Sequence, residues 1–368
     1  RVQCRSPDRA VLRDRRQIRA GGTVHGIDGL LERQIDGWRP RCLGGGTLAA
    51  RNACDMFRRR VRDSLTGALL LQTLLATDDS VSAADRCDAL DGVHLQVLGS
   101  GGPIADDGRS SAAYVVWQDG RSRVMIDAGG GSFLRFGEAG ASFDELDHIA
   151  ISHFHTDHSA DLTTFLKTGY FSDRQRPLGV SGPSGGGPFP ALASFLDSLI
   201  GSGGAYAYLG GYQAGSQGLV RIDPVTLDAT ARESMPVVTE DGLRITGIGV
   251  PHGIVPTIAF RVEVGGNTIV FASDQNGNDA SFAEFAKEAD VLVMHMVVPE
   301  NISGAGRALH APPSRIGEIA AMADAKSLVL SHFMARSLTG LDANIALVRA
   351  HYDGPVHVAE DLMCVPLD

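Results

Sequence analysis

Short apolar stretches that end at glycine-rich turns recur along the chain from about residue 93 onward. Residues 93–98 alternate apolar and polar side chains and stop at Gly99-Ser-Gly-Gly-Pro103. Residues 112–117 and 123–126 flank Gln118-Asp-Gly120, an arrangement that is typical of a β-hairpin. The pattern predicts a strand-rich domain that begins near residue 93.

Helical segments are expected between the strands. Apolar side chains have helical spacing at residues 281–289 and 313–325, and the second segment starts with a Pro-Pro-Ser sequence that suits a helix N-terminus. Residues 181–219 are instead rich in Gly, Ser and Tyr, so we expect a mobile loop or lid there. Strands with intervening helices predict an α/β (α+β) fold.

Several apolar strands end in a side chain that can bind a metal. A potential ligand follows residues 148–152 (His153), 243–250 (His252), 268–272 (Asp274) and 327–330 (His332). The chemistry of the protein is therefore expected at the ends of its strands.

The strongest chemical motif is His153-Phe-His155-Thr-Asp157-His158, which follows a strand and precedes a predicted helix over 159–166. Four such side chains within six residues are costly to bury unless they bind an ion. Neutral imidazoles together with a carboxylate are donors that Zn²⁺ prefers. Alternate residues of an extended turn point the same way, so this segment can supply ligands to two metal sites.

The first 84 residues differ from the rest in charge and pattern. Residues 1–55 hold eleven Arg and six acidic residues, so we expect a disordered or non-native upstream extension. Residues 56–84 combine an Arg-rich start, a short apolar run and small residues near Ala83, which is the pattern of an export signal. The alternative is an amphipathic helix packed on the domain. We expect residues 85–368 to form the catalytic domain of a periplasmic or secreted protein.

Two of the five cysteines, Cys87 and Cys364, remain if the chain is cleaved near Ala83. They either form a disulfide that joins the two ends of the domain, as an oxidising compartment would favour, or are unrelated buried thiols.

The charge balance disfavours nucleic acid as a partner. The chain has 33 Lys and Arg against 43 Asp and Glu, a net charge of −10, and only three lysines. Without residues 1–84 the chain has 18 basic and 34 acidic residues, a net charge of −16. Binding to nucleic acid depends on Lys and Arg at the phosphates, which this balance does not favour. No run of about 18 apolar residues occurs either, so no membrane partner is expected.

The motifs together resemble the metallo-β-lactamase superfamily of dinuclear metallohydrolases, and within it the ribonuclease Z-like and arylsulfatase-like branch. The resemblance extends over residues 93–363 and is carried by Leu98-Gly-Ser-Gly-Gly-Pro103, Met125-Ile-Asp127-Ala-Gly129, the histidine-rich motif, and then His252, Asp274 and His332 in order. It implies an αββα sandwich with its metals at one edge, between the two sheets.

The resemblance also implies two bound ions, expected to be Zn²⁺, with Mn²⁺ or Fe²⁺ as alternatives. The first ion would be held by His153, His155 and His252, the second by Asp157, His158 and His332, and both by Asp274. Two such ions can share a hydroxide that attacks phosphorus or a carbonyl carbon, so Asp157 and Asp274 count among the catalytic residues. Asp127 is expected to orient a metal-bound histidine, or else to form a turn.

His310 is the expected catalytic residue outside the ligand set. It stands 22 residues before His332, which resembles the ribonuclease Z-like arrangement. A protonated imidazole there can stabilise phosphoryl charge or protonate the leaving alkoxide, and the alternative is a surface histidine. His295, either a core or a functional residue, matches the first position of the H-E-A-T segment of those proteins, where Met296 replaces Glu. The chain then either uses Glu300 to orient His310 or relies less on His310.

The expected substrate is small. In the tRNA-processing members an arm that grips tRNA is inserted before the strand that leads to the bridging Asp, whereas here Gly265-Gly-Asn267 joins the two strands as a tight hairpin. The acidic charge and the export signal also argue against tRNA 3′-processing. We therefore expect a dinuclear zinc hydrolase of small phosphodiesters, either monomeric or a homo-oligomer. A lactonase or esterase of the acyl-homoserine lactone type, a β-lactamase and an arylsulfatase are the alternatives.

Overall fold

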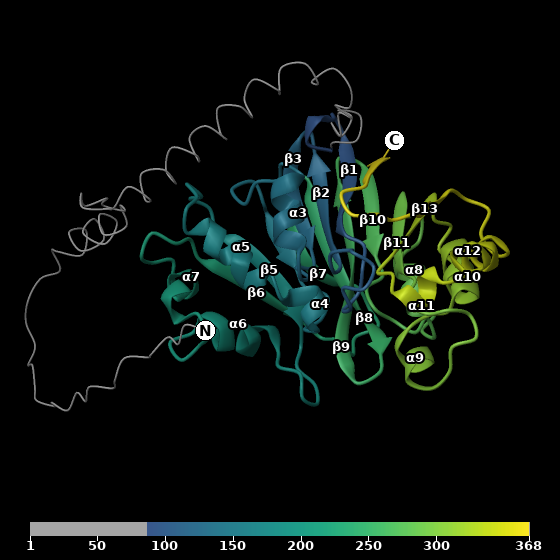
Figure 1. Cartoon of the computed structure of the whole chain (residues 1–368). Coiled ribbons are helices and arrows are strands. Elements are labelled where there is room, and N and C mark those ends of the chain that lie inside the picture. Colours follow the sequence, from purple (N-terminus) through teal and green to yellow (C-terminus); the bar gives the residue numbers. More distant parts are fainter. Residues whose placement is uncertain (1–86, 368) are drawn as a thin grey trace, which may run out of the picture. The chain divides into compact units, whose positions relative to one another are not determined.

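Two seven-stranded sheets pack face to face in the computed structural model, which describes residues 87–367 (Figure 1). The strand order is β14-β1-β2-β3-β4-β5-β6 in one sheet and β13-β12-β11-β10-β9-β8-β7 in the other. The predicted αββα sandwich is confirmed. The extension expected at 1–55 and the export signal expected at 56–84 lie outside the described residues.

The strands are short, and most are followed directly by a helix or a turn. The first sheet consists of β1 (Val93–Gly99), β2 (Ala113–Gln118), β3 (Arg121–Ile126), β4 (His148–Ala150), β5 (Leu178–Pro183), β6 (Ile222–Leu227) and β14 (Cys364–Leu367). The second consists of β7 (Met235–Glu240), β8 (Leu243–His252), β9 (Val255–Val264), β10 (Asn267–Phe271), β11 (Val291–His295), β12 (Ser327–Ser331) and β13 (Val356–Val358). The helices are η3 (Cys87–Ala89), α3 (Ser132–Glu138), α4 (Thr156–Ser159), α5 (Leu162–Gly169), α6 (Leu192–Ile200), η4 (Ala207–Leu209), α7 (Gly211–Ala214), α8 (Ser281–Phe285), α9 (Gly304–Leu309), α10 (Pro313–Met322), α11 (Ala335–Leu338) and α12 (Leu341–Arg349).

Both faces of each sheet are buried, which explains why the central strands are apolar throughout. In β2, Tyr114 and Val116 belong to the core between the sheets, whereas Val115 and Trp117 belong to the core beneath the outer helices. Helices α3, α5 and α6 cover the first sheet, and α8, α10 and α12 cover the second (Figure 1). A strand buried on two sides cannot alternate with polar residues without leaving them unsatisfied.

Strand direction brings the potential ligands to one edge. Strands β10, β11 and β12 are parallel neighbours, so their carboxyl ends lie at the same edge of the second sheet. In the first sheet, β4 runs parallel to β3 and to β5. His153 follows β4, and His252 is the last residue of β8. The sandwich therefore holds side chains from both sheets around a shared edge.

Residues 181–219 differ from the expectation of a mobile loop. The segment contains α6, η4 and α7, and Leu192, Leu196 and Ile200 are buried in the core beneath the helices. Buried Tyr212 donates its hydroxyl hydrogen to the carbonyl oxygen of Leu166 (2.7 Å). The apolar side chains recur every four residues within α6, a helical signal that the surrounding glycines obscure.

Two other predictions can be compared with the structure. Val264 pairs with Asn267, so β9 and β10 form the predicted tight hairpin. Cys87 and Cys364 form a disulfide with a Cα–Cα distance of 5.6 Å, which decides between the two alternatives for these cysteines. No helix within residues 87–367 is long and apolar enough to cross a membrane.

Candidate metal centre

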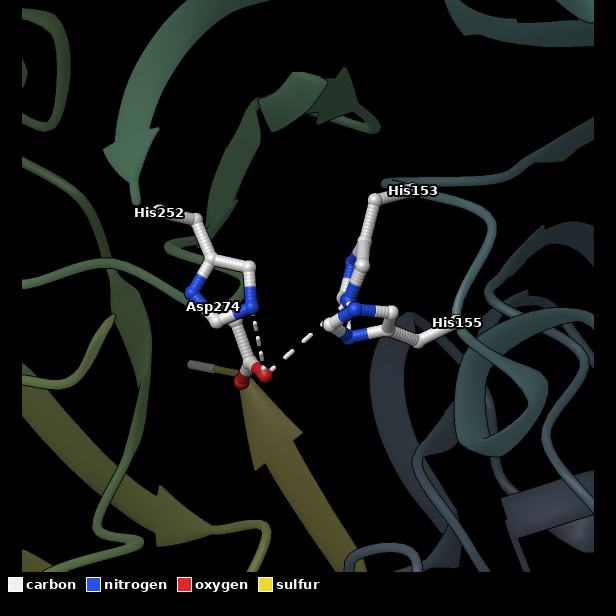
Figure 2. Close-up of side chains that lie close together, drawn as sticks. All are labelled: His153, His155, His252 and Asp274. Carbon is white, nitrogen blue, oxygen red and sulfur yellow. Dashed lines mark hydrogen bonds and ion pairs between the residues drawn. The ribbon is translucent and has the colours of Figure 1, made fainter. Parts of the chain in front are cut away.

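One group of potential ligands joins the first sheet to the second. The ligand atoms of His153, His155, His252 and Asp274 lie within 4.8 Å of one another (Figure 2). The Nε2 atom of His153 lies 3.0 Å from Nδ1 of His155 and 4.0 Å from Oδ2 of Asp274. The Nε2 atom of His252 lies 3.6 Å from the same carboxylate oxygen. These are the residues expected around the first metal ion.

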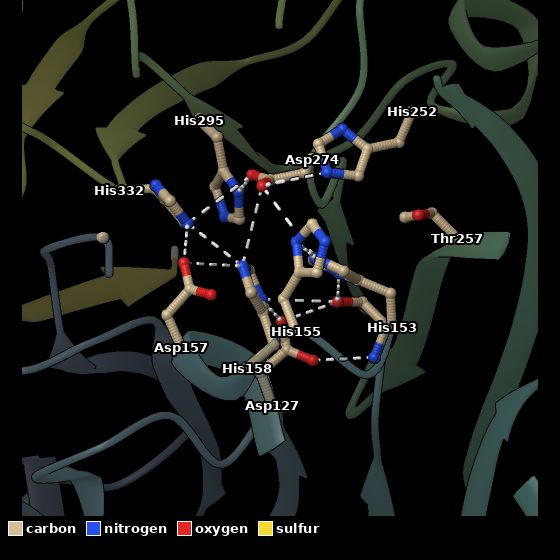
Figure 3. Close-up of polar contacts among 12 residues, drawn as sticks. Asp127, His153, His155, Asp157, His158, His252, Thr257, Asp274, His295 and His332 are labelled. Atoms are coloured by element: carbon tan, nitrogen blue, oxygen red, sulfur yellow. Dashed lines mark hydrogen bonds and ion pairs between the residues drawn. The ribbon is translucent and has the colours of Figure 1, made fainter. Parts of the chain in front are cut away.

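A second group shares Asp274 with the first (Figure 3). The Nε2 atoms of His158 and His332 lie 3.0 Å apart, and Nε2 of His332 lies 3.2 Å from Oδ2 of Asp157. Oδ2 of Asp274 lies 3.7 Å from Nε2 of His158, and Oδ1 of Asp274 lies 3.6 Å from Nε2 of His332. The structure thus brings all seven expected ligands together, with Asp274 between the two groups.

The donor atoms of this cluster suit divalent metal ions. His158 donates its Nδ1 hydrogen to Asp127, so its Nε2 carries a lone pair when the ring is neutral. That lone pair faces Nε2 of His332. Nε2 of His252 is buried and has no hydrogen-bond partner in the described part of the chain. Buried imidazole nitrogens that converge without hydrogen-bond partners are costly unless they bind a cation. Imidazole with carboxylate oxygen is a donor set for zinc and related divalent ions.

Asp127 holds one side of the cluster in place. Its carboxylate accepts hydrogen bonds from Nδ1 of His158 (2.7 Å), from the backbone N–H of Ser152 (2.7 Å) and from the hydroxyl of Ser152 (2.9 Å). Such a carboxylate fixes the tautomer and the orientation of a ligating histidine. Burial lowers the pKa of His158, but the Asp127 charge outweighs it and the pKa lies well above its usual value.

Backbone strain is concentrated at the same edge. Asp127, Ser273 and His332 have φ angles of 59°, 55° and 56°, a region that residues with a side chain rarely adopt. Each of these residues follows the end of a strand and is in the cluster or next to a member of it. Strain of this kind persists where the surrounding structure holds a functional geometry.

His295 is the member of the cluster that the sequence left undecided. Its Nδ1 donates to Oδ1 of Asp274 (2.7 Å), and its Nε2 lies 3.1 Å from the hydroxyl of Tyr114. Burial lowers the pKa of His295 to about 4. The neutral ring therefore positions the Asp274 carboxylate. The signal was present in the sequence, because His295 ends an apolar strand just as the predicted ligands follow theirs.

His310 lies beside the cluster, and no carboxylate within residues 87–367 forms a hydrogen bond with it, which favours the alternative that the chain relies less on His310. Its Nδ1 is 3.9 Å from Oδ1 of Asp274 and has no hydrogen-bond partner among the described residues. Glu300 does not orient it, because the Glu300 carboxylate accepts hydrogen bonds from the backbone N–H (2.9 Å) and the hydroxyl (2.5 Å) of Ser314 at the start of α10. Met296 is buried in the core.

The protonation state of His310 also differs from the expectation. Burial lowers the pKa of its imidazole to about 3, so the ring is neutral at pH 7 rather than protonated. A neutral imidazole still has one N–H to donate. Burial raises the pKa of Asp274, but the nearby His332 charge and the hydrogen bond from His158 outweigh it, so the pKa lies well below its usual value.

A cavity of about 460 Å³ opens above the cluster. Its wall combines polar and apolar side chains: Pro103, Phe154, His155, Thr156, Asp157, His252, Asp274, Val297, Leu309, His310, His332, Met334 and Arg336. Arg336 is the only Arg or Lys that residues 87–367 contribute to this wall. Its Nε donates to the carbonyl oxygen of Val297 (3.0 Å), and no carboxylate pairs with it within residues 87–367. Sequence reasoning missed Arg336, because its place in the wall depends on the short helix α11.

Known proteins resemble this chain over most of the described residues. The family model of the anti-Pycsar protein Apyc1 matches residues 93–180. Ribonuclease Z of Mycolicibacterium paratuberculosis (strain ATCC BAA-968 / K-10) is 27% identical over 294 residues, which cover 75% of this chain and 99% of that protein.

Among solved structures, the metallo-β-lactamase fold protein YhfI from Bacillus subtilis matches with a TM-score of 0.57 and 20% identity over 75% of this chain and 99% of its own. Human tRNase Z, short form, matches with a TM-score of 0.57 and 19% identity over the same two shares. At this level of identity the two structures establish the fold.

These relatives correct the expectations about the substrate. The preference for small phosphodiesters or other small esters, and the arguments against tRNA 3′-processing and against nucleic acid as a partner, are wrong, because relatives named ribonuclease Z match over nearly their whole length. The tight β9–β10 hairpin excludes an inserted arm at that point alone. The net charge is a sum over the whole chain and says little about the surface near the cavity.

Proposed function

We propose that this protein, which has the metallo-β-lactamase fold and belongs to that superfamily, is a metal-dependent phosphodiesterase that cleaves RNA, with precursor tRNA as the first substrate to test. The observation that carries the proposal is the pair of histidine and carboxylate groups joined by Asp274 beneath an open cavity (Figure 3). The near full-length similarity to ribonuclease Z supports an RNA substrate.

Seven side chains would bind the metal ions, and two others orient these ligands. His153, His155 and His252 would hold one ion, Asp157, His158 and His332 the other, and Asp274 both. Two divalent ions held in this way supply an activated water and neutralise the charge that develops on a phosphoryl group. Zinc suits this donor set best, with Mn²⁺ and Fe²⁺ as alternatives. Asp127 and His295 keep His158 and Asp274 in the orientation that the ligands need.

Two further side chains would contact the phosphodiester. The guanidinium of Arg336 has no carboxylate partner in the described chain and faces the cavity, so a phosphoryl oxygen can bind there. The neutral imidazole of His310 can donate one hydrogen bond to a phosphoryl or leaving oxygen. Apolar wall residues such as Phe154 and Leu309 exclude water from the reacting bond and can contact a base.

Export remains part of the proposal. The pattern of residues 56–84 and the Cys87–Cys364 disulfide support a periplasmic or secreted location, since disulfides persist in oxidising compartments. An RNA-cleaving enzyme in that location would meet RNA outside the cytosol, so the test substrates include RNA without a tRNA fold.

The full chain, loaded with zinc, is incubated with an end-labelled precursor tRNA that carries a 3′ trailer, and with an unstructured RNA of equal length. We expect endonucleolytic cleavage of at least one RNA, lost in Asp274→Ala and retained in the control His351→Ala, whose side chain is exposed away from the cluster. A zinc-loaded parent that cleaves neither RNA would contradict the proposal.

A further inference from the structure

Exposed aromatic rings gather around one lysine on the surface at the C-terminal end of α5. Four of the eight large apolar side chains that are exposed within residues 87–367 lie here, and the most exposed are Phe171 (79%) and Tyr208 (54%). Three of them surround the ammonium of Lys167, whose Nζ lies 4.4, 4.8 and 5.1 Å from the ring centres of Tyr170, Phe171 and Tyr208. The ring centre of the fourth, Tyr206, lies 6.5 Å from that of Tyr208. We call Lys167, Tyr170, Phe171, Tyr206 and Tyr208 the Lys167 patch.

The fold does not require these rings. None of the four belongs to either hydrophobic core, whereas Leu166 and Tyr212, which lie next to them in the sequence, are buried. The residues of the patch come from two segments of the chain. Lys167, Tyr170 and Phe171 lie at the C-terminal end of α5, and Tyr206 and Tyr208 lie in or next to η4. Exposed apolar side chains that cluster rather than scatter mark a surface that binds something.

Lys167 is also unusual among the three lysines of the chain. Lys287 and Lys326 each lie next to a carboxylate, Glu284 and Asp290, whereas no carboxylate pairs with Lys167 in the part of the chain that the structure describes. The rings hold its ammonium in place instead. The patch therefore offers flat apolar faces together with one unneutralised positive charge.

We propose that the Lys167 patch binds unstacked bases of the RNA substrate outside the metal centre. This proposal rests on the proposed function. Aromatic side chains stack on every kind of base, and a nearby cation takes the adjoining phosphate. A protein partner could pack against the rings equally well, but it does not in general carry a negative charge that would pair with the Lys167 ammonium. The combination of rings and charge therefore favours a nucleic acid.

The Lys167 patch is a surface separate from the cavity above the ligand cluster. None of its five residues is among the residues that line that cavity. An RNA that occupies both surfaces must therefore extend beyond the nucleotides at the cleaved bond, which a dinucleotide does not.

The test compares Phe171→Ala, Tyr208→Ala and Lys167→Met with Leu134→Ala and Lys326→Met, which remove an exposed apolar side chain and a lysine outside the patch. Binding of a fluorescent eight-nucleotide RNA and of a dinucleotide to the full chain is followed by anisotropy. Cleavage of precursor tRNA and of bis(p-nitrophenyl) phosphate is measured in parallel.

We expect each aromatic variant to weaken binding of the eight-nucleotide RNA, and to raise KM for precursor tRNA, by about fivefold or more. The dinucleotide, the small phosphodiester and both control variants are expected to behave as the parent does. Patch variants that bind the longer RNA as tightly as the parent would overturn the inference and leave the proposed function standing.

A parent that binds RNA through the patch but cleaves none would instead contradict the proposed function alone. Sedimentation of each variant decides whether the rings serve another partner. A change in oligomeric state with unchanged RNA binding would identify the patch as a contact between copies of the chain and overturn the inference.

Discussion

Replacing Asp127 by Asn tests whether a hydrogen bond to His158 sets the metal affinity of the second ligand group. Asn adopts the left-handed backbone conformation that Asp127 has (φ 59°), so the fold should tolerate the change. The amide oxygen can keep the hydrogen bond from the backbone N–H of Ser152 to Oδ1. The amide N–H₂ would replace Oδ2, which now accepts from Nδ1 of His158.

This exchange reverses one hydrogen bond. An amide N–H facing Nδ1 favours the tautomer in which His158 carries its proton on Nε2, and that nitrogen then has no lone pair for a metal. Loss of an orienting carboxylate typically costs 10-fold to 100-fold in metal affinity, which corresponds to about 1.4 to about 2.8 kcal/mol. The loss of one hydrogen bond to a charged group has a similar size.

The assay is a zinc titration of the full chain in competition with a chromogenic chelator, together with the melting temperature of the metal-free protein. We expect Asp127→Asn to bind the weaker of two zinc ions about 10-fold to 100-fold less tightly. The melting temperature of the metal-free form should fall as well, because the variant loses the Asp127 charge that favours protonated His158. Asp228→Asn, which alters an exposed turn carboxylate, is the control. Parental zinc affinity in Asp127→Asn would refute the assigned role of Asp127.

Three other perturbations have expected outcomes. Arg336→Met should lower kcat/KM for phosphodiester cleavage by about 10-fold or more with unchanged zinc content, and Arg336→Lys should restore part of it; an unchanged rate would remove Arg336 from the substrate site. Burial lowers the pKa of His148 to about 3, so as the pH falls the unfolded chain takes up a proton at this residue before the folded chain does. The free energy of unfolding should therefore be about 2 kcal/mol lower at pH 5 than at a pH well above 6.5. Urea unfolding at pH 8 and at pH 5 should show a smaller drop in the free energy of unfolding for His148→Leu than for the parent. An equal drop would show that another group is responsible. Cys364→Ser opens a disulfide that spans 277 residues, and the chain-entropy model gives a loss of up to about 6 kcal/mol. Reductant should lower the melting temperature of the parent but not of the variant, and a parent insensitive to reductant would contradict this.

The cluster of potential ligands was predictable because most of its members follow local signals in the sequence. His153, His155 and His158 follow one strand in a short motif, and His252 and His332 terminate or follow strands of their own. In a sandwich whose parallel strands end at one edge, such residues meet without any further information about packing. Potential ligands at strand ends, together with the resemblance to the metallo-β-lactamase superfamily, were therefore enough to group side chains from strands as distant in the chain as β4 and β12.

Other features depend on contacts that the sequence does not state. The partner of Glu300 is Ser314, so a plausible carboxylate for His310 serves as a helix cap instead. Arg336 reaches the cavity through the placement of α11. The substrate was misjudged for the same reason, because a total charge does not reveal where charge and aromatic rings gather. Lys167 illustrates this, since a chain with three lysines places one among exposed rings at the C-terminal end of α5.

The central claim is that seven side chains form one two-metal centre that cleaves phosphodiester bonds in RNA. The most direct test is to titrate the metal-free full chain with zinc while following the cleavage rate of precursor tRNA. The account predicts that the rate rises with added zinc, reaches its plateau at two ions per chain, and stays at the background level in Asp274→Ala. Full cleavage in the presence of a strong chelator, or no RNA cleavage at two bound ions, would contradict it.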